Sequence, residues 1–311
     1  MSFGVVLCVV FTVTWVVGMQ AQSGALVTML GVNAALQLLL FTAVACIPYL
    51  RTQRMSYVDI AWPFGVATIG VLILVLGDGA LVRRALTASV YLLIGLRMGL
   101  GALTMARKTG VIFHTEFPRY QYRHMVFEKA GTRHIRLHVL AEIMAQGLAN
   151  ASVLALPGFL LAINPSAELS AWELSGLGLW LIAYLLESTA DAQKLVFIHK
   201  NADPQGVCNI GLWRFSRHPN YFAEWLVWTG LVIAAAPSWW ALKDSEPAFI
   251  WGVLGLGSVA ASGMMYTTLV YLTGAVPAEY YSVRKRPAYA DYQQRTNRFF
   301  PWFPRSEKSL S

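Results

Sequence analysis

Long apolar segments constrain this chain more than any other feature of its sequence. Eight of them follow one another, at about residues 3–19, 25–48, 58–77, 85–106, 137–163, 172–190, 221–241 and 248–272. About 20 helical residues are needed to cross the roughly 30 Å of hydrocarbon in a bilayer. Only 13% of the residues are charged, and 56% are hydrophobic. The sequence therefore predicts an all-α, polytopic membrane helix bundle of about seven or eight transmembrane helices, with residues 1–311 forming one integral membrane domain.

The basic residues are placed unevenly between the apolar segments. Most of the 24 Lys and Arg residues lie in four stretches, which are 51–54, 107–136, 187–221 and the tail after residue 272. These stretches fall on one side of the predicted membrane, so the positive-inside rule places both termini in the cytoplasm. Arg83 and Arg84 are exceptions. The net charge of +8 thus reflects membrane topology, and we expect no nucleic-acid partner.

Several common functional patterns are missing from the sequence. The N-terminus has no basic region before its first apolar run, which predicts a membrane helix rather than a cleaved signal peptide. The three cysteines and six histidines have no disulfide or metal-ligand spacing, so we expect no metal. The sequence also lacks a dinucleotide-binding glycine motif after a strand, a Walker loop and a nucleophile elbow.

The densest polar block runs from Gly211 to Trp225, directly before and into the seventh apolar segment. Pro219 suits the first turn of a helix, where its missing N–H is not needed. Asn220 and Tyr221 would then lie in the first turn, and Glu224 one turn after Asn220. A helix start preceded by Arg214, Arg217 and His218 favours phosphate binding. The alternative is a basic anchor at a cytoplasmic helix end.

Ionisable residues inside apolar segments mark further candidates, because a charge in a membrane helix usually faces a partner or a cavity. Asp59 either caps the third segment or holds a carboxyl group in an apolar cavity, where it could donate a hydrogen bond to a bound carbonyl. Arg97 is expected to pair with Asp59 or Glu142. Glu142 itself lies close enough to a segment end to be solvated at the interface.

Two more polar stretches stand out in the C-terminal part. The block from Glu187 to Phe197 includes Asp191 and Lys194, which could contact ribose and phosphate groups, although an ordinary charged helix exit has a similar composition. The stretch from Tyr289 to Trp302 is aromatic and basic. It either folds back over the start of the seventh segment or lies on an anionic membrane surface.

The run Leu212-Trp213-Arg214-Phe215-Ser216-Arg217-His218-Pro219-Asn220-Tyr221, with Glu224-Trp225, resembles the signature of the steroid 5-alpha-reductase family. The similarity is closest to a bacterial, largely uncharacterised membrane branch, and sterol delta-14 reductases carry a similar block and tail. The resemblance also covers the Glu187 to Phe197 block and Asp59 with Trp62. It extends over about residues 187–303 and only weakly over 51–110.

The resemblance implies an NADPH-dependent reductase of a lipidic or steroid-like α,β-unsaturated carbonyl, located in a bacterial inner membrane. Residues 137–311 would form the cofactor half, open to the cytoplasm, and residues 1–136 the substrate side. The residues that the resemblance assigns to NADPH are Asp191, Lys194, Arg217, His218, Asn220, Tyr221, Glu224, Tyr292 and Arg295. Asp59 and Arg97 would be the catalytic candidates. The animal enzymes of the family have a tyrosine three residues before an arginine. Here Arg97 corresponds to that arginine, and Ile94 stands in place of the tyrosine.

Two other functions remain open. Membrane isoprenylcysteine carboxyl methyltransferases, which use S-adenosylmethionine, carry a similar Arg-His-Pro-x-Tyr block, and Glu279 with the stretch from Tyr289 to Arg298 is similar to theirs. Asn220 and the Glu187 to Phe197 block disfavour that interpretation. A non-enzymatic lipid-binding membrane protein with the same fold is the third alternative.

Overall fold

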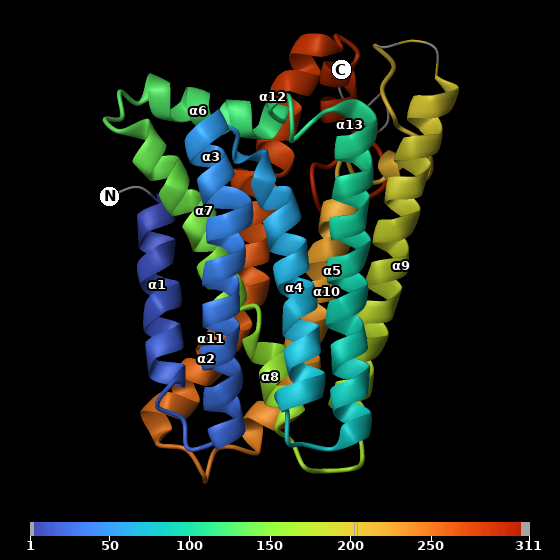
Figure 1. The fold of residues 1–311 in the computed structure, drawn as a ribbon. Coiled ribbons are helices and arrows are strands. Elements are labelled where there is room, and N and C mark those ends of the chain that lie inside the picture. The colour runs from blue at the N-terminus through green and yellow to red at the C-terminus, as the bar shows by residue number, and fades with distance from the viewer. Residues whose placement is uncertain (1–2, 202, 204, 306–311) are drawn as a thin grey trace. The chain divides into compact units, whose positions relative to one another are not determined.

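The computed structural model describes residues 3–201, 203 and 205–305, and in these residues it contains helices but no strand. Helix accounts for 77% of the described residues, and Val111 and Thr115 form an isolated bridge. The prediction of an all-α fold is confirmed. In chain order, with the labels of Figure 1, the elements are α1 (Phe3–Gly18), α2 (Gly24–Phe41), η1 (Thr42–Cys46), α3 (Ile47–Thr52), η2 (Met55–Tyr57), α4 (Val58–Leu76), α5 (Leu81–Thr109), α6 (Pro118–Lys129), α7 (Ile135–Ala151), α8 (Leu156–Ala162), α9 (Ala171–Lys200), η3 (Gly211–Arg214), α10 (Pro219–Trp240), α11 (Ala248–Thr267), η4 (Thr268–Leu272), α12 (Ala275–Lys285) and α13 (Tyr289–Arg295).

The chain forms two compact units. Unit 1 comprises residues 1–176 and 231–261, and unit 2 comprises residues 177–230 and 262–311. The helices α9, α10 and α11 each contribute residues to both units.

Five helical stretches among the described residues are long and apolar enough to cross a membrane, which fits a multi-pass membrane protein. They are Gly24–Thr52, Met55–Leu76, Leu81–Thr109, Ile135–Ala162 and Ala248–Lys285, and Gly4–Gly18 is a shorter apolar helix. The predicted segments at 172–190 and 221–241 form α9 and α10 but are not among the five. Carboxylates within α9, and Glu224, two prolines and four tryptophans within α10, lower the mean hydropathy of these two helices.

In unit 1, α4 and α5 pack closely because small residues lie between them, as is common in membrane helix pairs. A Cβ atom on Gly95 would lie 2.5 Å from both Ala67 N and Pro63 O, far inside van der Waals contact. On Gly101, six residues further along α5, nothing lies within 4 Å of such an atom. Glycine at position 95 is therefore required by the close approach of α4.

Three buried amide side chains link α2, α4 and α7 in the core of unit 1. Gln37 Nε2 donates to Asn33 Oδ1 (3.0 Å) and to Gly65 O (2.9 Å). Asn150 Nδ2 donates to Gln37 Oε1 (3.3 Å) and to Trp62 O (3.1 Å). All three amides are at most 1% exposed, and pairing them with one another and with carbonyls offsets the cost of burying them in an apolar core.

The two ends of unit 1 carry opposite charges. At one end, Arg54 donates to the carbonyls of Ile112 (3.1 Å) and Phe113 (2.6 Å), and Arg136 donates to Leu50 O (2.9 Å). The basic connections at 51–54 and 107–136 therefore meet there, as the charge pattern predicts. At the other end, both oxygens of Glu246 accept from Gln22 N at 2.9 Å, in front of α2.

Arg83, an exception to the charge pattern, lies at the acidic end and is only 2% exposed. Its Nε donates to Glu173 Oε1 at 2.5 Å, and its Nη2 donates to Glu168 O at 2.7 Å. It also donates to the carbonyls of Asn164 and Ser166. Arg83 is thus a buried partner of Glu173 and of the loop before α9. Because it is buried and paired, its position does not contradict the orientation that the other basic residues predict.

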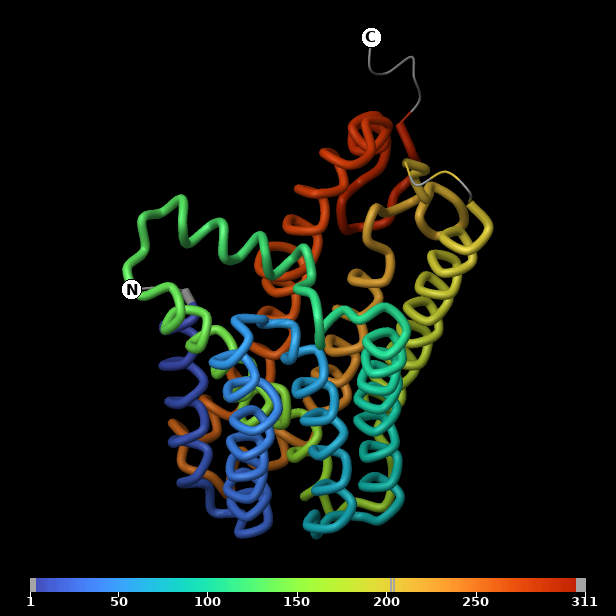
Figure 2. Tube along the Cα trace, turned by 45° about the horizontal axis from the view of Figure 1, so that its top comes forward, coloured from blue at the N-terminus to red at the C-terminus, as the bar shows by residue number. Residues whose placement is uncertain are grey.

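Hydropathy did not predict two features of unit 1. The connection between residues 107 and 136 contains α6, an amphipathic helix that runs across the ends of the parallel helices (Figures 1 and 2). The predicted segment 137–163 is broken after Ala151, where Ser152 leaves helical geometry, and the chain resumes as α8. Pro157 in the first turn of α8 favours this restart.

Aromatic side chains of unit 2 cluster around the buried ring of Phe299. Rings of Phe222, Trp225 and Tyr266 meet those of Phe299 and Phe300 at centroid separations between 5.2 and 6.2 Å, mostly edge to face. Such arrangements stabilise a core beyond the burial of their surface. They attach the end of the described chain to α10 and α11. Folding back in this way is one of the two alternatives that the sequence leaves for the tail.

Candidate functional site

The candidate site lies in unit 2 around the start of α10, which is preceded by the 3-10 turn η3. Leu212 N donates to Gln193 Oε1 (2.8 Å), and Trp213 Nε1 donates to Ala190 O (2.9 Å), so η3 is fixed to α9. Gly211 has a φ of 55°, in the left-handed region that favours glycine. A Cβ atom there would lie 2.5 Å from Gln193 Oε1. The glycine thus allows η3 to approach α9.

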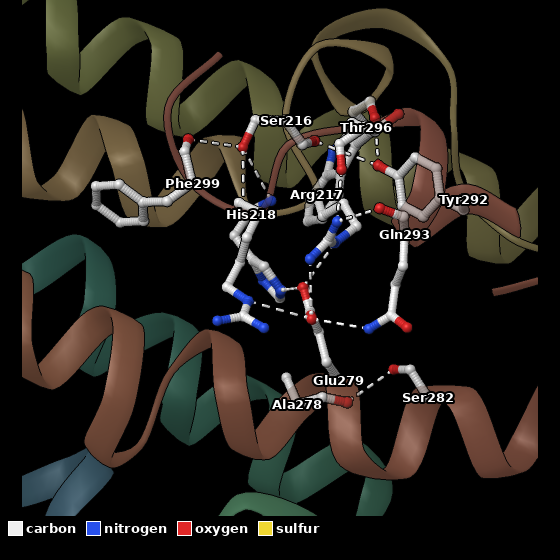
Figure 3. A network of polar contacts seen from close by, with 12 residues as sticks. Ser216, Arg217, His218, Ala278, Glu279, Ser282, Tyr292, Gln293, Thr296 and Phe299 are labelled. Atoms are coloured by element: carbon white, nitrogen blue, oxygen red, sulfur yellow. Dashed lines mark hydrogen bonds and ion pairs between the residues drawn. The ribbon is translucent and has the colours of Figure 1, made fainter. Parts of the chain in front are cut away.

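Arg217, predicted to contact a cofactor phosphate, is buried and bound to protein acceptors. Its Nε and Nη2 donate to the two oxygens of Glu279 at 2.7 and 3.1 Å, a bidentate ion pair (Figure 3). Its Nη1 donates to Gln293 O (2.9 Å) and Thr296 O (2.5 Å). Because these acceptors already occupy the guanidinium, a phosphate contact would require Arg217 to leave Glu279.

His218 is also buried and also faces Glu279. Its Nε2 lies 3.2 Å from Glu279 Oε1, and its ring stacks on Tyr221 with centroids 5.2 Å apart. Burial lowers the pKa of His218 from its ordinary value, although the neighbouring carboxylate of Glu279 opposes this effect. The imidazole is therefore held in its neutral form more readily than in water.

The tail closes over this block, so the prediction that it folds back is confirmed. Asn297 O accepts from Arg217 N at 2.9 Å, and Ser216 Oγ donates to Phe299 O at 2.8 Å. Tyr292, in α13, donates its hydroxyl to Trp213 O and Ser216 O. Burial raises the pKa of Tyr292, so the phenol stays protonated and can donate.

Glu279 is the residue that the site prediction lacked. Besides Arg217 and His218, it accepts from Gln293 Nε2 at 2.9 Å and from Arg298 Nε at 3.3 Å (Figure 3). It is 3% exposed and lies one turn into α12, in the last part of the apolar stretch Ala248–Lys285. A single carboxylate in a short helix forms no motif, and the only signal was its similarity to the methyltransferase block.

Asn220 and Asp191, two of the residues predicted to contact the cofactor, lie side by side in the structure. Asn220 Nδ2 donates to Asp191 Oδ1 at 3.1 Å, linking α10 to α9. Asn220 Oδ1 is buried and has no hydrogen-bond partner among the described residues. The ammonium of Lys194, one turn along α9 from Asp191, lies 4.5 Å from the centroid of the Trp213 ring.

The remaining predicted contacts in unit 2 differ in their burial. Glu224 is buried in the second turn of α10, and Tyr221 is half-buried. Arg295 is exposed at the end of α13. The structure therefore groups the predicted residues of α9, α10 and α13 in unit 2, with Glu279 added from α12.

Asp59, the predicted catalytic acid, lies in unit 1. Its Oδ2 accepts from Arg119 Nη2 at 2.5 Å, and its Oδ1 accepts from the hydroxyl of Tyr120 at 2.6 Å. Burial raises the pKa of Tyr120 well above its ordinary value, and the charge of Asp59 adds to this effect. Both partners come from α6, which hydropathy did not predict.

Arg97, the other catalytic candidate, lies half-buried in α5 of unit 1. Glu142, one of its two expected partners, forms an ion pair with Arg123 of α6. The carboxylates of Asp59 and Glu142 are thus each neutralised by an arginine of α6.

The donor set of unit 2 suits an organic ligand more than a metal ion. Within the described ranges, no group of three or more His, Cys, Asp or Glu side chains is placed to hold a metal ion. Two side chains of unit 2 offer polar groups to a ligand: Asn220 its amide oxygen and Lys194 its ammonium group. Such groups recognise hydroxyls, amides and phosphates.

Comparison with known proteins assigns most of the chain to a protein family. A family described as "Protein of unknown function (DUF1295)" matches residues 46–296. A curated relative, the uncharacterised protein C594.04c of the fission yeast Schizosaccharomyces pombe, is 30% identical over 152 residues, which cover 42% of this chain. The matched region spans only 39% of that relative's length. No solved structure matches the chain significantly.

Proposed function

Because this chain belongs to the DUF1295 family, which is the steroid 5-alpha-reductase-like group, we propose that it is an NADPH-dependent membrane reductase. Its substrate is a lipidic or steroid-like α,β-unsaturated carbonyl compound, whose carbon–carbon double bond is reduced. NADPH, when bound, supplies the hydride. The observation that carries the proposal is the polar cluster at the start of α10, where the block and the tail that carry the family resemblance meet.

Residues of unit 2 would hold the cofactor. The buried Oδ1 of Asn220 has no partner among the described residues, and it suits a ribose hydroxyl or a carboxamide N–H. Lys194 and the N–H groups at the start of α10 suit phosphate. Arg217 has a different role in this proposal. Through Glu279 and the carbonyls of α13 and the tail, it holds the segment that covers the site.

Unit 1 would supply the group that acts on the substrate carbonyl. Asp59 accepts hydrogen bonds from Arg119 and Tyr120. The guanidinium of Arg119 balances the charge of the carboxylate, and the hydroxyl proton of Tyr120 points at its other oxygen. Tyr120 has one hydroxyl proton, which it donates to Asp59. To stabilise a negative charge developing on the substrate oxygen, the hydroxyl would turn from Asp59 to that oxygen, and Asp59 would keep its ion pair with Arg119. Arg97 stays the second candidate in this unit.

The proposed location is an inner membrane, with the cofactor site facing the cytoplasm. The basic connections on one side of the predicted spans support this orientation. The apolar helices support a lipidic substrate that enters from the bilayer.

The first test is ligand binding by the detergent-solubilised protein, with NADPH, NADH and S-adenosylmethionine titrated separately and thermal unfolding followed. A ligand that binds only the folded state stabilises it by about 2.7 kcal/mol at a hundredfold excess over its Kd. We expect stabilisation by NADPH, and its loss in Asn220→Ala. Gln294→Ala, at an exposed position of α13, is the matched control. Unchanged NADPH affinity in Asn220→Ala would remove this residue from the site.

A membrane methyltransferase is the second candidate, favoured by the central position of Glu279, which belongs to the part of the sequence that resembles isoprenylcysteine carboxyl methyltransferases. Stabilisation by S-adenosylmethionine and not by NADPH would support this candidate and overturn the reductase. Stabilisation by none of the three ligands would contradict both and support a lipid-binding protein.

A further inference from the structure

The end of the described chain holds large aromatic side chains in exposed positions. In the C-terminal segment, which we define as residues 298–305, Phe300 is 51% exposed, Trp302 69% and Phe303 75%. The segment is nevertheless fixed to the rest of unit 2. Trp302 N donates to Phe215 O at 2.9 Å, and the ring of Phe303 meets that of Phe215 edge to face at 5.9 Å. Exposed aromatics on an ordered backbone indicate an interaction surface.

The position of these attachments indicates the depth of the segment relative to a bilayer. Phe215 lies four residues before Pro219, the first residue of α10, and Ser216 Oγ donates to Phe299 O at 2.8 Å. The C-terminal segment therefore lies at the start of α10, an apolar helix that is not among the five candidate spans. Aromatic residues are enriched where membrane helices leave the hydrocarbon, because their rings suit the headgroup layer.

The charge of the segment is positive. Arg298 and Arg305 belong to it, and Arg214 lies directly before the attachment point; all three are exposed. Residues 292–305 contain no Asp or Glu. Glu279, which accepts from Arg298 Nε, is buried and already paired with Arg217. The exposed surface of the segment thus carries guanidinium groups beside aromatic rings.

We propose that the C-terminal segment lies in the headgroup layer and binds anionic phospholipids of the bilayer that the protein spans. Trp302 and Phe303 insert their rings at the boundary with the acyl chains. Arg214 and Arg305 face the phosphate groups, while their apolar stems lie along the lipid surface. The surface is distinct from the cofactor residues of the proposed function and does not depend on that function.

The first experiment measures the affinity of the intact protein for phosphatidylglycerol. The protein is held in nanodiscs of phosphatidylcholine with increasing phosphatidylglycerol, and the retained anionic lipid is counted by native mass spectrometry. Each basic residue at a membrane surface contributes roughly a fivefold increase in affinity. We therefore expect the double substitution Arg214→Gln and Arg305→Gln to weaken binding about 25-fold.

Lys243→Gln is the matched control, because Lys243 is exposed in the turn after α10, at the other end of the same helix. It removes a positive charge without touching the C-terminal segment, so we expect no change in phosphatidylglycerol affinity. If the double variant keeps wild-type affinity, or if Lys243→Gln weakens binding as much, the proposal is overturned.

The second experiment measures depth. A small fluorophore is attached to Phe303→Cys in a variant without the native cysteines, and quenching is measured with phospholipids that carry a nitroxide at the headgroup or along the acyl chain. We expect nitroxides at the headgroup and at the first acyl carbons to quench the fluorophore. Water-soluble nitroxides and nitroxides at the end of the acyl chain should quench it only weakly. Quenching only from water would place the segment outside the bilayer and refute the insertion of Phe303.

Discussion

Glu279 is expected to be the carboxylate whose loss most destabilises unit 2. It is 3% exposed, and its two oxygens accept from Arg217 at 2.7 and 3.1 Å and from Gln293 at 2.9 Å. Glu279→Ala would leave the guanidinium of Arg217 buried without its counter-charge. Breaking a buried ion pair from one side costs about 3–5 kcal/mol. At about 2–4 °C per kcal/mol, the unfolding midpoint should fall by roughly 6–20 °C.

Cys208 offers a local reporter for this prediction, since it lies in unit 2 and is 2% exposed. With the other two cysteines replaced, a thiol-reactive fluorophore follows the exposure of Cys208 during heating. Glu168→Ala is the matched control, because Glu168 is exposed and surface substitutions usually change stability by less than about 0.5 kcal/mol. If Glu279→Ala unfolds within about 2 °C of the wild type, the ion pair does not hold the tail as we infer.

Arg217→Met combined with Glu279→Leu separates the charge from the rest of the network. Replacing a buried ion pair by apolar side chains is often close to neutral. The carbonyls of Gln293 and Thr296 would still lose the N–H groups of Arg217, at about 1–3 kcal/mol for a buried group without a partner. We therefore expect the double variant to recover only part of the stability that Glu279→Ala loses.

Two further outcomes follow from the packing and the charges. Gly95→Ala should destabilise the chain by about 1–3 kcal/mol, because its Cβ would meet α4. Gly101→Ala on the same helix should leave stability unchanged or raise it by up to about 1 kcal/mol, so equal thermal shifts would contradict the close packing. The lowered pKa of His218 means that the unfolded chain binds more protons, so stability should fall as the pH drops below 6.5. His218→Gln should flatten that part of the pH profile, as measured by thermal unfolding between pH 7.5 and roughly 5.5, and an unchanged profile would assign the acid sensitivity to another group.

The apolar segments of the fold could be predicted because the bilayer fixes their length. Most of their bounds agree with the helices to within a few residues, but α9 continues to Lys200, ten residues past the predicted segment 172–190. The features that hydropathy missed have a different origin. The helix α6 is amphipathic and owes its place to Arg119, Tyr120 and Arg123, whose partners lie far away in the sequence. The break after Ala151 depends on backbone geometry at Ser152, to which a hydropathy average is insensitive.

The candidate site was predictable where a motif concentrates polar residues, as at Arg217 to Tyr221. What the motif could not give is the direction of each side chain. Arg217 faces Glu279, a carboxylate 62 positions away that completes its ion pair, and its contact with a cofactor stays a prediction. Long-range pairing of this kind leaves no local pattern, and the same holds for the amide cluster of Asn33, Gln37 and Asn150.

The ion pair of Arg83 with Glu173 has a consequence for the order of synthesis. The two residues are 90 positions apart, so the start of α5 enters the membrane well before its counter-charge leaves the ribosome. Until the beginning of α9 arrives, Arg83 must keep its guanidinium hydrated, because a buried charge without a partner is costly. The hairpin of α4 and α5 therefore reaches its final depth only after the loop at residues 164–173 has been translocated beside it.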